Sequence, residues 1–151
     1  MTSNLRVRPA ELGDIAAMLH IAAHAATASA WALDQYNAIF KPESPRRVAL
    51  VIEEQGMVKG FIVGRILGPE WEIENVAVTG DARRRGLGSH LLGEFITLAR
   101  AEAAAAVILE VRESNHAARM LYEKWAFEET GRRAAYYSNP TEDAILLTFS
   151  L

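Results

Sequence analysis

The chain has 151 residues, of which 50% are hydrophobic, and this is enough for one domain with its own core. The net charge of -3 does not favour a nucleic-acid or membrane-surface protein, and the lack of cysteine excludes disulfides, thiolate metal sites and a cysteine nucleophile. The N-terminus lacks the apolar core of a signal peptide, and no apolar stretch of roughly 18 residues occurs. We therefore expect a single domain over residues 1–151 in a soluble, cytoplasmic protein.

The first part of the chain predicts a strand and two helices. Alternating side chains over residues 5–8 indicate a strand, and apolar residues recur at helical spacing over residues 15–22. Residues 29–40 place aromatic and apolar side chains on one helical face. For this second helix we expect Ser29 as the N-cap and Trp31 as a core residue of the first turn.

The remainder predicts six strands and two helices. Three β-branched runs separated by glycine turns indicate an antiparallel meander, and strand, helix, strand and helix patterns then follow in turn. The expected strands cover residues 47–54, 57–67, 71–78, 105–112, 127–137 and 143–151, and the expected helices start at Gly86 and at Ser114 or Asn115. The fold class is therefore mixed α/β, with about seven strands in one largely antiparallel sheet and about four helices.

Residues 76–92 raise the question of which anion the chain binds. An apolar strand runs into three arginines and then into Gly86-Leu87-Gly88, which opens an amphipathic helix. Backbone N–H groups at a helix N-terminus, together with the helix dipole, bind anions such as phosphate. The loop lacks the Gly-Lys-Ser/Thr of a Walker A motif and the third glycine of a Rossmann fingerprint, so neither of these nucleotide-binding loops is indicated.

The order of motifs resembles the GNAT superfamily of acetyl-CoA-dependent N-acetyltransferases, and within it the RimI type, which acetylates the N-terminal alanine of a ribosomal protein. The likeness rests on NVAV before the glycine loop, on LEVRESNHAARMLYEKWAF after it, and on the YY and EDAILL segments near the end. It implies the GNAT fold, in which two central parallel strands splay apart, and acetyl-CoA as the cosubstrate. One departure from the family is Ala126-Phe127, where Gly-Phe is usual.

The resemblance also implies which residues contact acetyl-CoA. In the family, Arg/Gln-x-x-Gly-x-Gly/Ala wraps the pyrophosphate, and the strand before this loop pairs with the pantetheine arm and the acetyl carbonyl. The asparagine of the SN pair hydrogen-bonds the pantetheine region, although by itself it is equally a helix cap. The residues implied in this way are Val76, Ala77, Val78, Arg84, Arg85, Gly86, Leu87, Gly88, Ser89 and Asn115.

Acetyl transfer to an amine uses a base for the amine and an acid for the departing thiolate. Strand alternation places Glu110 and Arg112 on one face, so Glu110 is either a structural partner of Arg112 or a functional group. In the RimI type the glutamate of LEVR is the base and the tyrosine of LY is the acid, which implies these roles for Glu110 and Tyr122. Glu72 is the alternative base, because other GNAT branches use a glutamate on the earlier strand, whereas Glu74 is expected to face solvent.

For the acceptor, the resemblance implies that Tyr136 and Tyr137 lie in the loop between the last two strands and hold a substrate peptide. The expected partner is a protein N-terminus, such as that of a ribosomal protein, whose α-amine has a pKa of about 7.7 to 8, within reach of a weak base. Two other functions stay open, a GNAT enzyme for a small-molecule amine and a non-catalytic acyl-CoA-binding domain. The four histidines show no metal-ligand spacing, so no metal is expected.

Overall fold

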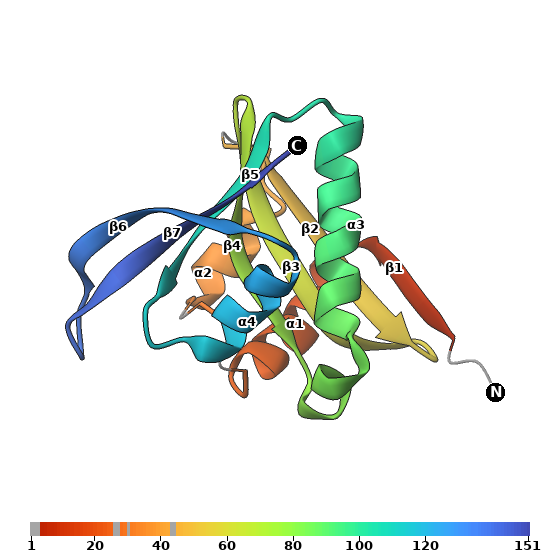
Figure 1. Cartoon of the computed structure of the whole chain (residues 1–151). Coiled ribbons are helices and arrows are strands. Elements are labelled where there is room, and N and C mark those ends of the chain that lie inside the picture. Colours follow the sequence, from red (N-terminus) through yellow and green to blue (C-terminus); the bar gives the residue numbers. More distant parts are fainter. Residues whose placement is uncertain (1–3, 26–27, 30, 43–44) are drawn as a thin grey trace.

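The computed structural model describes residues 4–25, 28–29, 31–42 and 45–151. In this part of the chain, one seven-stranded sheet has the order β1-β2-β3-β4-β5-β7-β6 (Figure 1). Neighbouring strands pair antiparallel, except that β4 and β5 pair parallel. The strands are β1 (Leu5–Pro9), β2 (Arg47–Glu54), β3 (Met57–Leu67), β4 (Glu70–Val78), β5 (Ala106–Arg112), β6 (Glu128–Tyr137) and β7 (Glu142–Ser150). The mixed, largely antiparallel sheet expected from the sequence is confirmed.

Helices cover both faces of the sheet. The α-helices are α1 (Ile15–Ala22), α2 (Leu33–Ala38), α3 (Leu87–Ala101) and α4 (His116–Lys124), and the 3₁₀ segments are η1 (Leu12–Asp14) and η2 (Gly80–Arg85). The long helix α3 crosses one face, and α1 and α2 lie on the other (Figure 1). Alternate residues of β2 serve the two cores, since Leu50 and Ile52 pack on the α3 side and Val51 on the α1 side. No helix in the described residues is long and apolar enough to cross a membrane.

The centre of the sheet opens between β4 and β5. The two strands pair at only three positions, Glu70 with Ala106, Trp71 with Val107 and Glu72 with Ile108. Beyond these pairs, β4 stays bound to β3 and β5 stays bound to β7. The two strands therefore diverge along the rest of their length, which is the splayed parallel pair that the family resemblance implies.

The second helix starts later than expected. It begins at Leu33, and the side chain of Gln35 accepts a hydrogen bond from the N–H of Ala32 at 2.8 Å. Ser29 is not its cap, because its hydroxyl donates to the carbonyl of Glu74 at 2.6 Å and its N–H donates to the Asn75 side chain at 2.9 Å. These two hydrogen bonds thus hold Ser29, which precedes α2, against strand β4.

Contacts and backbone geometry close to each end of α4 explain where this helix begins and ends. The side chain of Asn115 accepts a hydrogen bond from the N–H of Ala118 at 3.2 Å, so Asn115, and not Ser114, is the cap. At the other end, Ala126 has a φ of 65°, in the left-handed region that favours glycine. The family's usual glycine at this position is therefore explained by backbone geometry, and this chain adopts the same turn with alanine.

Candidate active site

The glycine loop forms an anion-binding geometry at the start of α3. Gly86 lies between η2 and α3 with a φ of 76°, and its carbonyl accepts the first helical hydrogen bond, from His90 at 2.9 Å. The N–H groups of Leu87, Gly88 and Ser89 precede this bond at the positive end of the helix dipole. Such an arrangement suits a phosphate group.

Gly88 adds a second reason to place a ligand here. A Cβ atom at this position would meet only the side chains of Val78 and Leu121, at 3.8 and 3.9 Å, which is ordinary contact. Packing within the protein therefore does not require glycine at position 88. Close approach of a ligand to the backbone would require it, as the family resemblance implies for the pyrophosphate of acetyl-CoA.

The arginines of this loop differ in what they contact. Arg85 donates two hydrogen bonds to the carboxylate of Glu54 at the end of β2, which raises the pKa of Arg85. Lys59 forms an ion pair with Asp81 at 3.2 Å, so a second contact fastens η2 to the β2–β3 hairpin. Arg85 would have to leave Glu54 to reach a phosphate. The backbone of Arg84 lies in η2, but its side chain is outside the described part of the structure.

The side chain of Ser89 has a structural partner. Its hydroxyl accepts a hydrogen bond from the indole N–H of Trp125 at 2.7 Å, which joins α3 to the end of α4. Gly93 makes room for this indole, since a Cβ there would lie 3.0 Å from the Trp125 ring. The Ser89 hydroxyl accepts this bond and keeps its own O–H as a donor, so both its backbone and its side chain remain available to an anion.

The strand before the loop presents its backbone to the gap in the sheet. Val76, Ala77 and Val78 lie beyond the last parallel pair of β4, at Glu72, and their side chains are buried in the two cores. A ligand in this gap would meet main-chain groups of β4, whatever the side chains. This placement agrees with the role that the resemblance implies for these residues.

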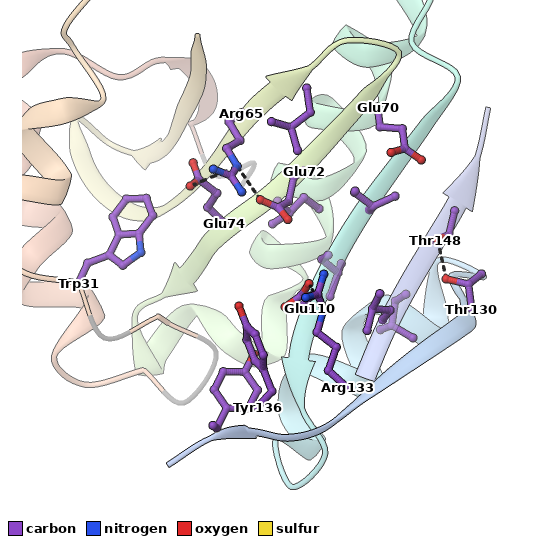
Figure 2. A pocket seen from close by; sticks show the side chains of 17 residues that line it. Trp31, Arg65, Glu70, Glu72, Glu74, Glu110, Thr130, Arg133, Tyr136 and Thr148 are labelled. Atoms are coloured by element: carbon purple, nitrogen blue, oxygen red, sulfur yellow. Dashed lines mark hydrogen bonds and ion pairs between the residues drawn. The ribbon is translucent and has the colours of Figure 1, made fainter. Parts of the chain in front are cut away.

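A cavity of about 690 Å³ lies where β4, β5, β6 and β7 meet (Figure 2). It collects residues that are far apart in the sequence, including Glu72, Glu110, Tyr136, Tyr137 and Trp31. Its volume is within the usual range for a small-ligand site. The candidate base, the alternative base and both candidate acceptor-binding tyrosines thus line one cavity.

Glu110 is paired with an arginine, but not with the expected one. Nε of Arg133 lies 3.0 Å from a carboxylate oxygen of Glu110, as Figure 2 shows. Arg112 instead pairs with Glu142 at 3.2 Å. Arg112 as the partner of Glu110 is therefore wrong, whereas Glu110 is a partnered carboxylate, as the structural alternative supposed.

The two glutamates of β4 are also ion-paired. Glu72 accepts a hydrogen bond from Arg65 at 2.7 Å, and Glu74 accepts two from Arg47 at 3.0 and 3.3 Å. Glu74 is thus largely buried in an ion pair and does not face solvent, contrary to the expectation from sequence.

The two candidate bases, Glu72 and Glu110, differ in where they lie relative to the gap between β4 and β5. Glu72 belongs to the last parallel pair, with Ile108, whereas Glu110 lies two residues past Ile108, where β5 has left β4. Glu110 therefore sits at the opening between the strands and Glu72 within their paired part. The geometry favours Glu110 as the group closer to a thioester held in the gap.

Tyr122, from helix α4, lies in the core on the α3 side of the sheet. Its side chain is 3% exposed, and its ring packs edge-on against Phe127 with 5.3 Å between centroids. Burial raises the pKa of Tyr122, because the phenolate would lose its hydration. The hydroxyl is protonated at neutral pH with or without this shift, and Tyr122 is not among the described residues that line the cavity.

Aromatic residues form the acceptor side of the cavity. Tyr136 and Tyr137 are the last residues of strand β6 and do not lie in the loop after it, contrary to the expectation, and their rings are 5.1 Å apart in an edge-on arrangement. Burial, together with the nearby Glu110 carboxylate, raises the pKa of Tyr137. Trp31 precedes α2 instead of starting the helix; it packs, partly buried, against the core on the α1 side, as expected in part, and it also lines the cavity (Figure 2). The only sequence signal for this role was its place between the first two helices, which wall the acceptor groove in the family.

Comparison with known proteins agrees with this geometry. The family model described as "Acetyltransferase (GNAT) family" matches residues 15–127. The chain belongs to the GNAT acetyltransferase family. It is therefore an acetyl-CoA-dependent N-acetyltransferase, and its glycine loop and splayed strands fit that cosubstrate.

Similar GNAT proteins include enzymes of the RimI type. The chain is 33% identical over 148 residues to the putative [ribosomal protein bS18]-alanine N-acetyltransferase of Bacillus subtilis, covering 97% of this chain and 96% of that protein. It is 32% identical over 111 residues to the corresponding Escherichia coli enzyme, covering 72% and 75% of the two chains. The crystal structure of the Escherichia coli ribosomal-protein-S18-alanine N-acetyltransferase matches with a TM-score of 0.83 and 29% identity, over 97% of this chain and 93% of that one.

No group of three or more His, Asp or Glu side chains among the described residues is placed to hold a metal ion.

Proposed function

We propose that this GNAT enzyme acetylates the N-terminal α-amine of a protein, with a ribosomal protein that begins with alanine as the first candidate. The observation that carries the proposal is Glu110 at the opening between β4 and β5, inside a cavity walled by Trp31, Tyr136 and Tyr137. The names of the RimI-type relatives support the same acceptor.

Each site residue has one task in this proposal. Acetyl-CoA supplies an acetyl group activated as a thioester. The N–H groups at the start of α3 hold the pyrophosphate, and the backbone of residues 76–78 orients the acyl end in the gap. Glu110 takes the proton from the α-ammonium, directly or through a water, and the amine then attacks. As the C–N bond forms and the C–S bond breaks, the hydroxyl of Tyr122 gives its proton to the leaving sulfur, and the second proton of the amine, released to solvent, replaces it.

The cavity favours a peptide over a small amine. It receives side chains from β3, β4, β5, β6 and β7 and from Trp31, so it extends well beyond the neighbourhood of Glu110. A small amine would contact only the part beside this carboxylate. The paired tyrosines and the tryptophan offer flat surfaces, with hydroxyl and N–H groups, along which a peptide backbone can lie.

The test is an acetylation assay with purified protein, acetyl-CoA and a panel of acceptors. Peptides that begin with alanine, including the Ala-Arg type, should release CoA thiol faster than polyamines or free amino acids. Faster acetylation of the small amines would favour that alternative function, and binding of acetyl-CoA with no acceptor turnover would indicate an acyl-CoA-binding domain. Because the chain has no cysteine to hold an acetyl group, initial-rate lines for the two substrates should intersect; parallel lines would contradict direct transfer.

A further inference from the structure

Arg112 joins strand β5 to the turn between β6 and β7. Its guanidinium donates to the carboxylate of Glu142 at 3.2 Å and to the carbonyls of Pro140 and Ser138 at 3.3 and 3.2 Å. The same guanidinium lies 4.4 Å from the ring centroid of Tyr137. One side chain thus makes four contacts with the segment that carries a candidate acceptor-binding tyrosine.

The carboxylate of Glu142 extends this cluster toward the cosubstrate side. It accepts hydrogen bonds from the N–H and the hydroxyl of Ser114, at 2.9 and 3.0 Å, and these bonds lower the pKa of Glu142. Ser114 is followed by Asn115, the cap of α4. The carboxylate of Glu142 therefore connects Arg112 and the turn between β6 and β7 with the residue before the cap of α4.

The tyrosines need such an anchor because the strand ladder is interrupted beside them. The register of β6 against β7 breaks between Arg133 and Tyr137, and Ala135 has a φ of 51°. Within this stretch, the N–H of Ala135 bonds to the side chain of Asp143 at 2.9 Å instead of to a strand partner. Tyr137 rejoins the ladder opposite Glu142, so its position depends on that pair and on the side-chain contacts around it, and not on a continuous run of pairs.

We infer that Arg112 is a positioning residue for the acceptor, and this inference rests on the proposed function. Arg112 is two residues after Glu110 on the same face of β5, so it sets Tyr137 at a fixed place relative to the base. It touches neither the acyl group nor the attacking amine. Its effect on the reaction passes through Tyr137 and the turn at residues 138–140.

Arg112→Lys tests the inference with the charge retained. Lysine can keep an ion pair with Glu142, but it cannot spread planar donors over two carbonyls while it stacks on a ring. Loss of the stacking and of two hydrogen bonds should raise the acceptor KM by about tenfold. The kcat and the affinity for acetyl-CoA should stay within about twofold of wild type, since these contacts are not made with either reacting group.

Arg132→Lys is the matched control. Arg132 is on the same hairpin and pairs with Glu113 at 2.6 Å and Asp143 at 2.9 Å, but it is outside the cavity lining. Its acceptor KM should not change. If Arg112→Lys leaves the acceptor KM unchanged, or weakens acetyl-CoA binding as much as acceptor binding, the positioning role is excluded.

Hydrogen exchange of the substrate-free protein separates this inference from the proposed function. The segment of residues 134–138 should exchange faster in Arg112→Lys than in Arg132→Lys, because lysine at position 132 keeps an ion pair with Asp143, and Asp143 keeps its hydrogen bond from the N–H of Ala135. Unchanged exchange in Arg112→Lys would overturn the anchor, whatever the acceptor is. Failure of the wild-type protein to acetylate any peptide would instead reject the proposed function, and exchange would still decide the role of Arg112.

Discussion

Glu110 and Arg133 form an ion pair in which Nε of the arginine lies 3.0 Å from the carboxylate, at the opening between β4 and β5. The Arg133 side chain is 56% exposed and that of Glu110 is 20% exposed. A pair with so much contact with water stabilises a fold by only about 0–1 kcal/mol. The arginine can therefore leave Glu110 at little free-energy cost when an acceptor ammonium arrives.

Glu110→Gln should lower kcat by about 10²- to 10⁴-fold, because it keeps the shape of the side chain and removes the base. Calorimetry should show almost unchanged affinity for acetyl-CoA. Glu72→Gln is the matched variant, since Glu72 lines the same cavity and also pairs with an arginine. If Glu72→Gln is inactive and Glu110→Gln is near wild type, the base is on β4, and the small-amine function becomes the better proposal.

Tyr122→Phe should lower kcat by about 10²-fold, the lower end for loss of a positioned acid. The ring and its contact with Phe127 remain, so the thermal midpoint should stay close to that of wild type. The loss should shrink with an acyl donor whose leaving group needs no proton. An equal loss with both donors would mean that the hydroxyl does not serve the leaving group.

Gly88→Glu should abolish detectable binding of acetyl-CoA in a calorimetric titration. The protein has room for a Cβ at this position, so the loss would come from a negative charge placed among the N–H groups that face the phosphates. Gly88→Ala is the control for shape, and it should weaken binding less while leaving the thermal midpoint unchanged. Equal affinity of wild type and Gly88→Glu would remove the loop from the cosubstrate site.

Asp14 should make the fold sensitive to acid. It accepts hydrogen bonds from Arg8 at 2.8 and 3.0 Å and from the N–H of Glu11 at 2.7 Å, and the Arg8 guanidinium lowers the pKa of Asp14. A carboxyl whose folded pKa lies below its unfolded value of about 3.9 stabilises the fold above that value, and this stability is lost as the pH falls through the folded pKa.

Asp14→Asn should therefore lower the free energy of unfolding at neutral pH by up to about 3 kcal/mol, the low end for a broken buried ion pair, because Glu53 still pairs with Arg8. Urea denaturation at several pH values measures this. The variant should lose less stability than wild type between neutral pH and pH values near the folded pKa. Parallel curves for the two proteins would show that Asp14 is not responsible.

Local patterns in the sequence were sufficient for most of the sheet. Alternation over residues 105–112 assigned Glu110 to the face opposite Leu109, and the structure agrees, because Leu109 packs in the core on the α3 side and Glu110 pairs with Arg133. The opening between β4 and β5 could not be derived from such patterns, since it depends on where two distant strands stop pairing. It was expected only through the family resemblance.

The errors have one physical origin, a long-range contact that outweighs a local preference. Arg112 is close to Glu110 in sequence, but Arg133 reaches it from β6. Ser29 has the residue type and position of a helix cap, yet it bonds to β4. Such long-range partners are determined by the folded sheet, and the residues next to them in the sequence do not indicate them.

Because β4 and β5 pair at only three positions, bound acetyl-CoA would add to the stability of the fold as well as act as a reactant. Each interstrand hydrogen bond that a closed sheet would gain there stabilises by about 0.5–1.5 kcal/mol, and the amide groups of pantetheine can restore some of them. The native state should then become more stable as the cosubstrate concentration rises. In a cell, the supply of acetyl-CoA would thus set the lifetime of the folded enzyme as well as its rate.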